Sequence, residues 1–197
     1  MNAEAECGRR WLVQQSLHSI GSVHGRFQVF HNDHLDYLLA GLAQCEHLLV
    51  GITSYLVTSL SQSDTAPHRG QAQNNPLTYF ERCGMIRQSL IERGIDVARF
   101  TFTPFPIETP TLLPQFIPIS IPCLTTVYDD WNREKVRLLR EAHYQVVVLW
   151  ERSEKKMSGS DIRQQIAAGS TEWRQLVPPA TVRAVEELDL SSRLRRV

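Results

Sequence analysis

The stretch His24–Leu35, which reads HGRFQVFHNDHL, decides how this chain folds and where its chemistry lies. An apolar strand ends at Gly25, a tight loop follows, and a helix begins with His31 and His34 in its first turn. That spacing points both imidazoles the same way, beside backbone N–H groups that have no partner within the helix. Such a helix start attracts phosphate through its free donors and its dipole, and imidazoles add further donors. The stretch therefore predicts an anion site suited to phosphoryl chemistry.

Five short segments on either side of this loop have the composition of buried strands, because they are short, apolar and rich in β-branched or aromatic residues. They cover residues 19–25, 47–53, 98–103, 122–128 and 145–150. Helical patterns lie between several of them, at residues 35–42, 78–94 and 132–142. Strands that alternate with helices predict an α/β fold built on a doubly wound parallel sheet of about five strands.

The last forty residues show helical patterns and no strand. Ile162 and Ile166 fit a short helix closed by Gly169, and a second helix begins near Pro178. We therefore expect a small C-terminal helical appendix to the sheet. The expected parts are an N-terminal extension over residues 1–18, a core over residues 19–157 and a helical part over residues 158–197.

Two segments are predicted to be loops. Residues 59–76 are polar and carry Gly, Pro and Asn, which favours a surface loop. Residues 104–122 contain six prolines, which exclude a regular helix, yet the segment is apolar and should pack on something. It is either a cover over the sheet edge or a wall of a substrate pocket, and the pattern leaves both open.

The composition of the 197 residues excludes several classes of protein. Lys and Arg number 21, as do Asp and Glu, so the formal net charge is zero, which disfavours a nucleic-acid binder and a polybasic membrane-surface protein. No apolar run approaches the ~18 residues of a membrane span, and the first residues lack a signal-peptide pattern. We expect a cytoplasmic protein. Its four cysteines form no C-x-x-C pair, and we expect no metal site built from side chains alone.

A second phosphate-binding pattern lies in the C-terminal part, at residues 158–163, which read SGSDIR. Ser158 or Ser160 can cap the helix that follows, and Arg163 lies about one turn in, on the capping face. Arg binds phosphate oxygens in a bidentate manner, so this helix start is also suited to an anion.

Together these patterns resemble the nucleotidyltransferases with an H-x-G-H signature, and most closely the archaeal-type nicotinamide mononucleotide adenylyltransferases. The family's first loop reads G-R-F-Q-P-F-H-x-G-H-L, where this chain has GRFQVFHNDHL. Its N-P-F-T-x-x-E-R, S-G-T-E-I-R and W-x-x-L-V-P motifs correspond to segments that begin at Asn75, Ser158 and Trp173. The four matches are in order and span nearly the whole chain, from about residue 19 to 190.

The resemblance implies a Rossmann-like fold and attack by a substrate phosphate on the α-phosphate of a nucleoside triphosphate, with release of pyrophosphate. The catalytic residues that it implies are His31, His34 and Arg163. The nucleotide-binding residues that it implies are Gly25, Arg26, Phe27, Ser158, Gly159, Ser160 and Ile162. Mg²⁺ is expected as the cofactor, bound mainly through the triphosphate.

Asp33 stands where the family has glycine, and Val29 stands where it has proline. An aspartate suits a helix start but is unfavourable beside a triphosphate. Three outcomes stay open: Asp33 turns away from the nucleotide, contacts the base, ribose or acceptor, or indicates lost catalysis. Because both histidines and the SGSDIR segment are present, we expect an active enzyme.

The acceptor side departs further from the family. The resemblance implies an Asn and a Trp in the segment that follows the third predicted strand, and here that segment carries no Trp. The candidate substrate-binding residues are Asp33, Arg82, Phe116, Tyr128, Asp129 and Trp131. Trp131 is equally compatible with a packed helix start. We expect transfer of AMP from ATP to nicotinamide or nicotinate mononucleotide. The alternatives are adenylyl or cytidylyl transfer from ATP or CTP to another phosphorylated small molecule, and a non-catalytic nucleotide sensor. A homo-oligomer is left open.

Overall fold

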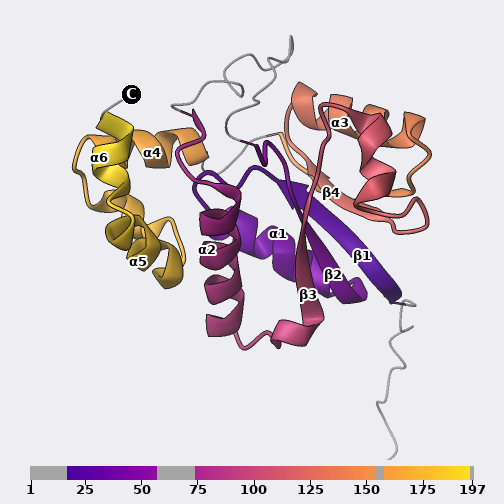
Figure 1. Ribbon diagram of the computed structural model, residues 1–197, viewed down its shortest axis with the longest axis horizontal. Helices are drawn as coiled ribbons and strands as arrows, with labels where there is room; N and C mark the ends of the chain where they lie inside the picture. The colour runs from indigo at the N-terminus through magenta and orange to yellow at the C-terminus, as the bar shows by residue number, and fades with distance from the viewer. Residues whose placement is uncertain (1–16, 57–73, 154–157, 196–197) are drawn as a thin grey trace, which may run out of the picture.

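One parallel sheet organises the molecule. The computed structural model describes residues 17–56, 74–153 and 158–195, and in these ranges five strands pair in the order β3-β2-β1-β4-β5 (Figure 1). The strands are β1 (His18–Gly25), β2 (Cys45–Ile52), β3 (Phe100–Pro104), β4 (Cys123–Val127) and β5 (Val146–Glu151). The predicted sheet is confirmed, with strand ends that differ from the expected ones by at most two residues.

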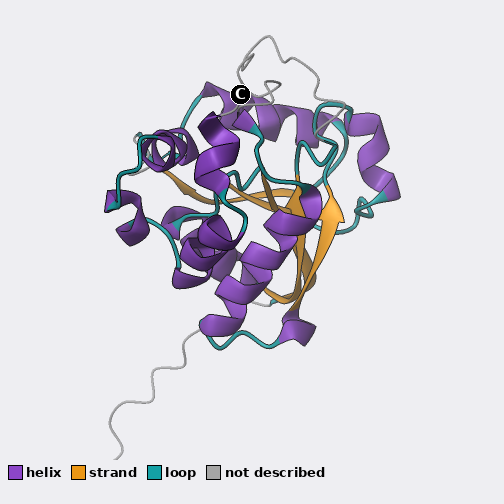
Figure 2. Cartoon of the chain, turned by 60° about the vertical axis from the view of Figure 1, so that its left-hand side comes forward, coloured by secondary structure: helices purple, strands orange, loops and turns teal. Residues whose placement is uncertain are grey.

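Helices cover both faces of the sheet (Figure 2). The helices are α1 (Asn32–Leu42), α2 (Tyr79–Glu92), α3 (Asp130–Glu141), α4 (Gly159–Ala167), α5 (Pro179–Glu187) and α6 (Leu190–Arg195). α1 and α2 link β1, β2 and β3, and bury Leu38 and Ile86 in the larger hydrophobic cluster. α3 links β4 to β5 and buries Leu139 in a second cluster. From β1 the chain continues to β2 and β3 on one side, and from β4 it continues to β5 on the other side. Because both sets of crossovers are right-handed, their helices lie on opposite faces of the sheet.

The third predicted strand begins two residues later than expected. A short 3₁₀ helix, η4 (Val97–Arg99), occupies its start, because the side chain of Asp96 accepts a hydrogen bond from the backbone N–H of Ala98 at 2.9 Å. This local cap favours a turn over extended backbone, and β3 therefore begins at Phe100.

The proline-rich segment covers a face of the sheet rather than its edge. It contains only a short 3₁₀ helix, η5 (Pro110–Gln115), in agreement with the exclusion of a regular helix. Phe105 and Ile117 are fully buried in the second cluster, and the Tyr144 hydroxyl donates to the Ile117 carbonyl at 2.6 Å. Ile107 also lines the cavity described below, so the segment contributes to a pocket wall as well.

The C-terminal helices share the larger hydrophobic core with α1 and α2. Ile162, Trp173 and Leu190 are buried in the same cluster, with the 3₁₀ helix η6 (Glu172–Gln175) between α4 and α5. α4, α5 and α6 gather beside α2, on the side of the molecule away from α3 (Figure 1). An ion pair of 2.7 Å between Arg193 and Glu81 joins α6 to the start of α2.

Two expectations fall mostly outside the described residues. These are the N-terminal extension over residues 1–18, of which His18 already belongs to β1, and the surface loop over residues 59–76. Among the described residues, no helix has both the length and the apolar character needed to cross a membrane.

The topology places a crevice at one edge of the sheet. β1 and β4 are neighbours at its centre, and the chain leaves them in opposite directions. In open α/β sheets, ligands bind at this switch point, beyond the carboxyl ends of the strands. The loop that follows β1 lies at that edge.

Candidate active site

A cavity of about 520 Å³ lies at the carboxyl ends of β1 and β4 and is enclosed by the starts of α1, α3 and α4. Most of the site residues selected from the sequence line it. They are Gly25, Arg26, Phe27, His31, Asp33, His34, Tyr128, Asp129, Trp131, Ser158, Gly159, Ser160 and Arg163. Segments more than 130 residues apart in the chain therefore meet around one hollow.

The loop between β1 and α1 is held by its own packing. Phe27 has a φ of +54°, an uncommon conformation for a non-glycine residue, and its ring is buried against the preceding backbone. A Cβ on Gly25 would lie 2.9 Å from that ring, so glycine is required there. The amide of Gln28 donates to the Leu77 carbonyl at 2.8 Å and accepts from the Leu77 N–H at 3.0 Å. These contacts fix the loop to the segment that precedes α2.

The two histidines stack on each other at the start of α1. Their ring centroids lie 3.6 Å apart, and Phe27 packs edge-on against His34 at 5.0 Å. The backbone N–H of His31 donates to Nδ1 of His34 at 3.4 Å. Nδ1 is therefore the acceptor, and the neutral His34 ring carries its proton on Nε2. The His34 residue also lines the cavity.

α4 approaches the same loop very closely. Ser158 caps the helix, since its hydroxyl accepts from the Asp161 N–H at 3.2 Å. A Cβ on Gly159 would lie 2.7 Å from the carbonyl oxygen of Gln28, which makes glycine necessary at this contact. Arg163 donates to that same carbonyl and, at 2.8 Å, to Oδ1 of Asn74. Arg163 thus joins α4 to the loop of the histidines.

Two buried guanidinium groups give the cavity positive charge. Burial, together with the nearby charge of Arg26, lowers the pKa of Arg163 to about 10. Burial also lowers the pKa of Arg26, against the opposing charge of Glu108. Nη1 of Arg26 is buried and has no hydrogen-bond partner among the described residues. Both groups remain cations near neutral pH, and an anion between them would relieve their repulsion.

Arg82 does not line the cavity. Its side chain is fully buried in α2, where it donates to the backbone carbonyls of Thr78, Arg26, Thr53 and Ser54 at 2.9–3.2 Å. These bonds tie α2 to the ends of β1 and β2. The geometry gives Arg82 a positioning role, in place of the direct substrate contact expected from the sequence.

Phe116 and Ile162 also lie away from the cavity lining. Phe116 packs against the second hydrophobic cluster, with its ring 6.2 Å from that of Tyr55. Ile162 is fully buried in the larger cluster, where it packs with the core residues of α1 and α2. Ile162 therefore anchors the helix that carries Arg163.

The wall at which the sequence places the acceptor is formed by the start of α3 and the end of β4. Asp129 caps α3 by accepting from the Asn132 N–H at 2.9 Å, and the Tyr128 hydroxyl accepts from Nε1 of Trp150 at 2.6 Å. Trp131 lines the cavity and also packs on the second hydrophobic cluster, as expected for a packed helix start. Asp33 faces the cavity as well.

Among the polar residues on this wall that sequence reasoning missed, His24 and Lys135 are buried and carry basic groups. His24 precedes Gly25 at the end of β1, and Lys135 lies on the buried side of α3, which otherwise carries arginine as its basic residue. Two features of the sequence could have indicated these residues. His24 is a polar residue within an apolar strand, and Lys135 is a charged residue on the apolar face of a helix. Both side chains are more than nine-tenths buried.

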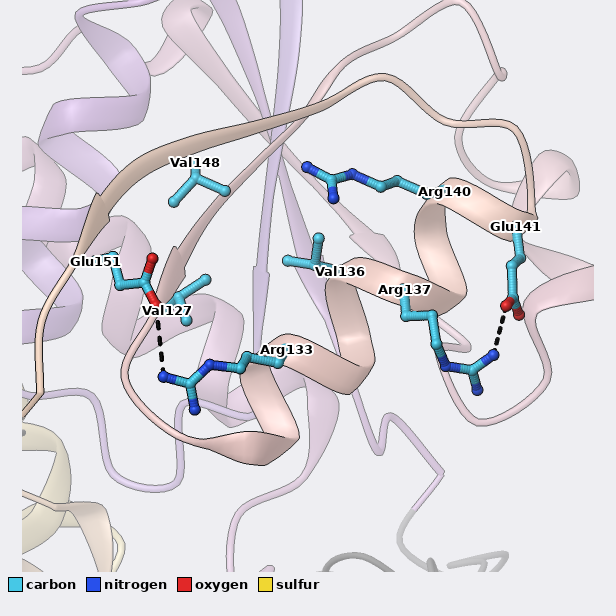
Figure 3. A pocket seen from close by; sticks show the side chains of 8 residues that line it. All are labelled: Val127, Arg133, Val136, Arg137, Arg140, Glu141, Val148 and Glu151. Carbon is cyan, nitrogen blue, oxygen red and sulfur yellow. Dashed lines mark hydrogen bonds and ion pairs between the residues drawn. The ribbon is translucent and has the colours of Figure 1, made fainter.

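A second hollow, of about 570 Å³, lies between α3 and β5 (Figure 3). Two of its three arginines pair with carboxylates, with Arg133 3.4 Å from Glu151 and Arg137 2.5 Å from Glu141. It contains no histidine and no helix start. The charge and donors needed for phosphoryl chemistry therefore lie in the first cavity.

Comparisons with known proteins identify relatives of this chain. No family model matches the chain. The chain is 38% identical over 181 residues to phosphonoformate cytidylyltransferase from Streptomyces viridochromogenes, covering 92% of this chain and 98% of that protein. It is 30% identical over 180 residues to nicotinamide-nucleotide adenylyltransferase from Saccharolobus solfataricus, covering 91% and 96%.

Solved structures agree on the fold. A bifunctional NMN adenylyltransferase/ADP ribose pyrophosphatase from Francisella tularensis, complexed with AMP and a manganese ion, superposes with a TM-score of 0.65 at 16% identity. The match covers 91% of this chain and 52% of that one, so this chain spans about half its length. A putative nicotinate-nucleotide adenylyltransferase from Vibrio parahaemolyticus superposes with a TM-score of 0.54 at 13% identity over 98% of its length.

Proposed function

Because this chain belongs to the H-x-G-H nucleotidyltransferase family that includes these relatives, we propose that it transfers a nucleoside monophosphate from CTP or ATP to a small, strongly acidic phosphonate or phosphate. Nucleotidyl transfer is the activity of the family. The proposal concerns the triphosphate, the acceptor and the residues that act on them.

The observation that carries the proposal is the meeting of two helix starts at one cavity. α1 brings His31 and His34, and α4 brings Ser158 and Arg163, with Arg26 between them. Each helix start directs the positive end of its dipole toward the cavity, which favours an anion there. A triphosphate carries several negative charges on neighbouring phosphates and is suited to such a paired site.

In the proposed reaction, an acceptor oxygen attacks the α-phosphorus while the bond to the pyrophosphate oxygen breaks. Negative charge increases on the α-phosphate oxygens and on the leaving group. Nε2–H of His34 and the ring of His31 stabilise the α-phosphate, and Arg163 and Arg26 stabilise the departing pyrophosphate. The residues position and stabilise the reacting groups, and no covalent enzyme intermediate is required.

Mg²⁺ fits this cavity as a partner of the triphosphate. Among residues 17–56, 74–153 and 158–195, no three His, Cys, Asp or Glu side chains are grouped so as to hold a metal ion by themselves. The Asp33 carboxylate lines the cavity and can supply one oxygen ligand, while phosphate oxygens and water supply the rest. Bound in this way, Mg²⁺ would neutralise part of the triphosphate charge.

We also propose a cytoplasmic location, since Cys45, Cys83 and Cys123 are free thiols.

Two acceptors are candidates. A small phosphonate, with CTP as donor, is supported by the 38% identity to phosphonoformate cytidylyltransferase over nearly its full length and by a buried lysine on the acceptor wall. Nicotinate or nicotinamide mononucleotide, with ATP as donor, is supported by the 30% identity to nicotinamide-nucleotide adenylyltransferase. The buried Lys135 favours the acidic phosphonate over nicotinamide mononucleotide, whose pyridinium ring is cationic.

The test is pyrophosphate release from purified full-length protein with Mg²⁺. CTP and ATP are each combined with phosphonoformate, nicotinamide mononucleotide or nicotinate mononucleotide, and each triphosphate is also measured without an acceptor. We expect release that requires an acceptor and is fastest with CTP and phosphonoformate. Binding of triphosphate without release for any acceptor would instead support the nucleotide sensor and overturn the proposal.

A further inference from the structure

One side chain on the acceptor wall is buried without any polar partner. The ring of His24 is 2% exposed and lies flat on the ring of Phe105, with centroids 4.2 Å apart and planes 11° apart. Both ring nitrogens of His24 are buried and have no hydrogen-bond partner among the described residues, although the residue lines the cavity. A buried polar group without a partner costs free energy, and such groups are rare unless a ligand satisfies them.

A cation lies on the same wall. Lys135 of α3 is 8% exposed and lines the same cavity. Burial and the charge of Lys135 together hold the pKa of His24 well below its usual 6.5. His24 is therefore neutral at physiological pH, and one of its ring nitrogens carries a proton that it can donate. A neutral donor and a positive charge thus lie near each other at the cavity wall.

The two walls of the cavity differ in chemistry. The wall of α1 and α4 has guanidinium groups and helix starts, which are suited to phosphates with multiple charges. The opposite wall has one ammonium group and one imidazole, which are suited to a single negative charge. The start of α3 also contributes Asp129, which caps the helix, and Asp130, which pairs with Arg133 at 2.9 Å.

We propose that His24 and Lys135 form a carboxylate subsite for the acceptor, which selects acceptors that carry a carboxylate in addition to the reacting phosphonate or phosphate. The carboxylate accepts a hydrogen bond from the His24 ring and pairs with the Lys135 ammonium. This inference rests on the proposed nucleotidyl transfer and specifies the acceptor. The same carboxylate chemistry occurs in a carboxylated phosphonate and in nicotinate mononucleotide.

The test uses acceptor pairs that differ only in this group. Phosphonoformate is compared with carbamoylphosphonate, and nicotinate mononucleotide with nicotinamide mononucleotide. The variants are Lys135→Gln and His24→Phe, which keeps an aromatic ring against Phe105. Arg140→Gln is the matched control, because it removes one positive charge from an exposed position of the same helix. For each protein, kcat and KM are measured for each acceptor, and the Kd of CTP is measured by calorimetry.

We expect Lys135→Gln to lower kcat/KM for the carboxylated acceptors roughly 10- to 100-fold, chiefly through KM. His24→Phe is expected to act in the same direction. The amide acceptors and the Kd of CTP should change less than about threefold, and Arg140→Gln should behave as wild type. The carboxylated acceptor for which wild type has the higher kcat/KM shows whether the carboxylate belongs to a phosphonate or to nicotinate mononucleotide. Equal losses for carboxylate and amide acceptors, or no loss, would overturn the subsite.

A binding measurement separates this inference from the proposed function. Calorimetric titration of phosphonoformate into each protein requires no turnover. Binding that wild type shows and Lys135→Gln loses supports the subsite even if no pyrophosphate is released, in which case the proposed function fails alone. Pyrophosphate release that is unchanged in both variants supports the function and overturns the subsite. If Lys135→Gln does not fold, His24→Phe gives the same comparison.

Discussion

Replacing Gly159 by alanine should separate α4 from the loop of the histidines. The new Cβ would lie 2.7 Å from the carbonyl oxygen of Gln28, whereas ordinary contact begins near 3.4 Å, so α4 or the loop must move by about 0.7 Å. The obstructing atom belongs to the backbone, so no side-chain rotation relieves the contact. Overpacking of this kind costs about 1–3 kcal/mol, and the better helix preference of alanine returns at most about 1 kcal/mol.

The same movement displaces Arg163, which donates to the Gln28 carbonyl. A misplacement near 1 Å can cost about a hundredfold in rate. For Gly159→Ala we therefore expect a free energy of unfolding lower by about 1–2 kcal/mol and a kcat/KM lower by roughly 10- to 100-fold. Urea unfolding gives the first quantity, and pyrophosphate release the second.

Gly84→Ala is the matched control. Gly84 lies exposed in the middle of α2, and a Cβ there would have no heavy atom within 4 Å. Alanine should raise the free energy of unfolding by about 0.5–1 kcal/mol at that position, with unchanged activity. If Gly159→Ala behaved like Gly84→Ala in both measurements, the close approach of α4 to the loop would not be what positions Arg163.

Three other predictions concern single side chains. His34→Ala should reduce kcat by about 10²–10³-fold, the loss of one transition-state donor, with an unchanged circular dichroism spectrum; a near-normal rate would refute its role. Burial and Lys135 keep His24 unprotonated in the folded protein, whereas the unfolded chain binds a proton below about pH 6.5. Stability should therefore fall as the pH drops below 6.5, by up to about 1.4 kcal/mol per pH unit, and His24→Phe should remove that part of the slope in urea unfolding across pH. Arg82→Met removes the side-chain donor of four carbonyls, of which the Thr53 carbonyl is in a buried bond, so the free energy of unfolding should fall by about 3 kcal/mol or more. If the variant changed only the KM of the acceptor, Arg82 would contact the substrate directly after all.

The triphosphate side of the candidate site was predictable because its determinants are local. His31 and His34 are set by the first turn of one helix, and Ser158 caps another helix within three residues. Periodicity within short segments was enough to place these residues at helix starts. Their convergence followed from the resemblance, since spacing alone does not bring α1 and α4 together.

The roles of Arg82 and Phe116 depend on contacts between distant segments. Arg82 shares a motif with acidic and polar neighbours, and nothing local shows that four carbonyls from three segments surround its guanidinium. Phe116 belongs to a segment whose prolines exclude a regular helix without defining its path. The side chain that this segment presents to the cavity is Ile107.

The acceptor wall was the least predictable part. His24 shows in the sequence only as a polar residue in an apolar strand, and Lys135 only as one charge in a charged helix. Their significance appears when Phe105 covers the His24 ring and when α3 turns Lys135 toward the cavity. These contacts arise from the packing of α3 and the proline-rich segment on one face of the sheet.

The bond between Arg163 and the Gln28 carbonyl joins residues 135 positions apart, and this separation affects how the site is made during protein synthesis. At about 5–20 residues per second, the ribosome adds Arg163 roughly 7–27 s after Gln28. During that interval β1, α1 and β2 can pair, since their contacts are close in sequence. The nascent chain thus exposes the histidine loop before α4 exists to complete the site, and nucleotide binding should appear as one of the last events of folding.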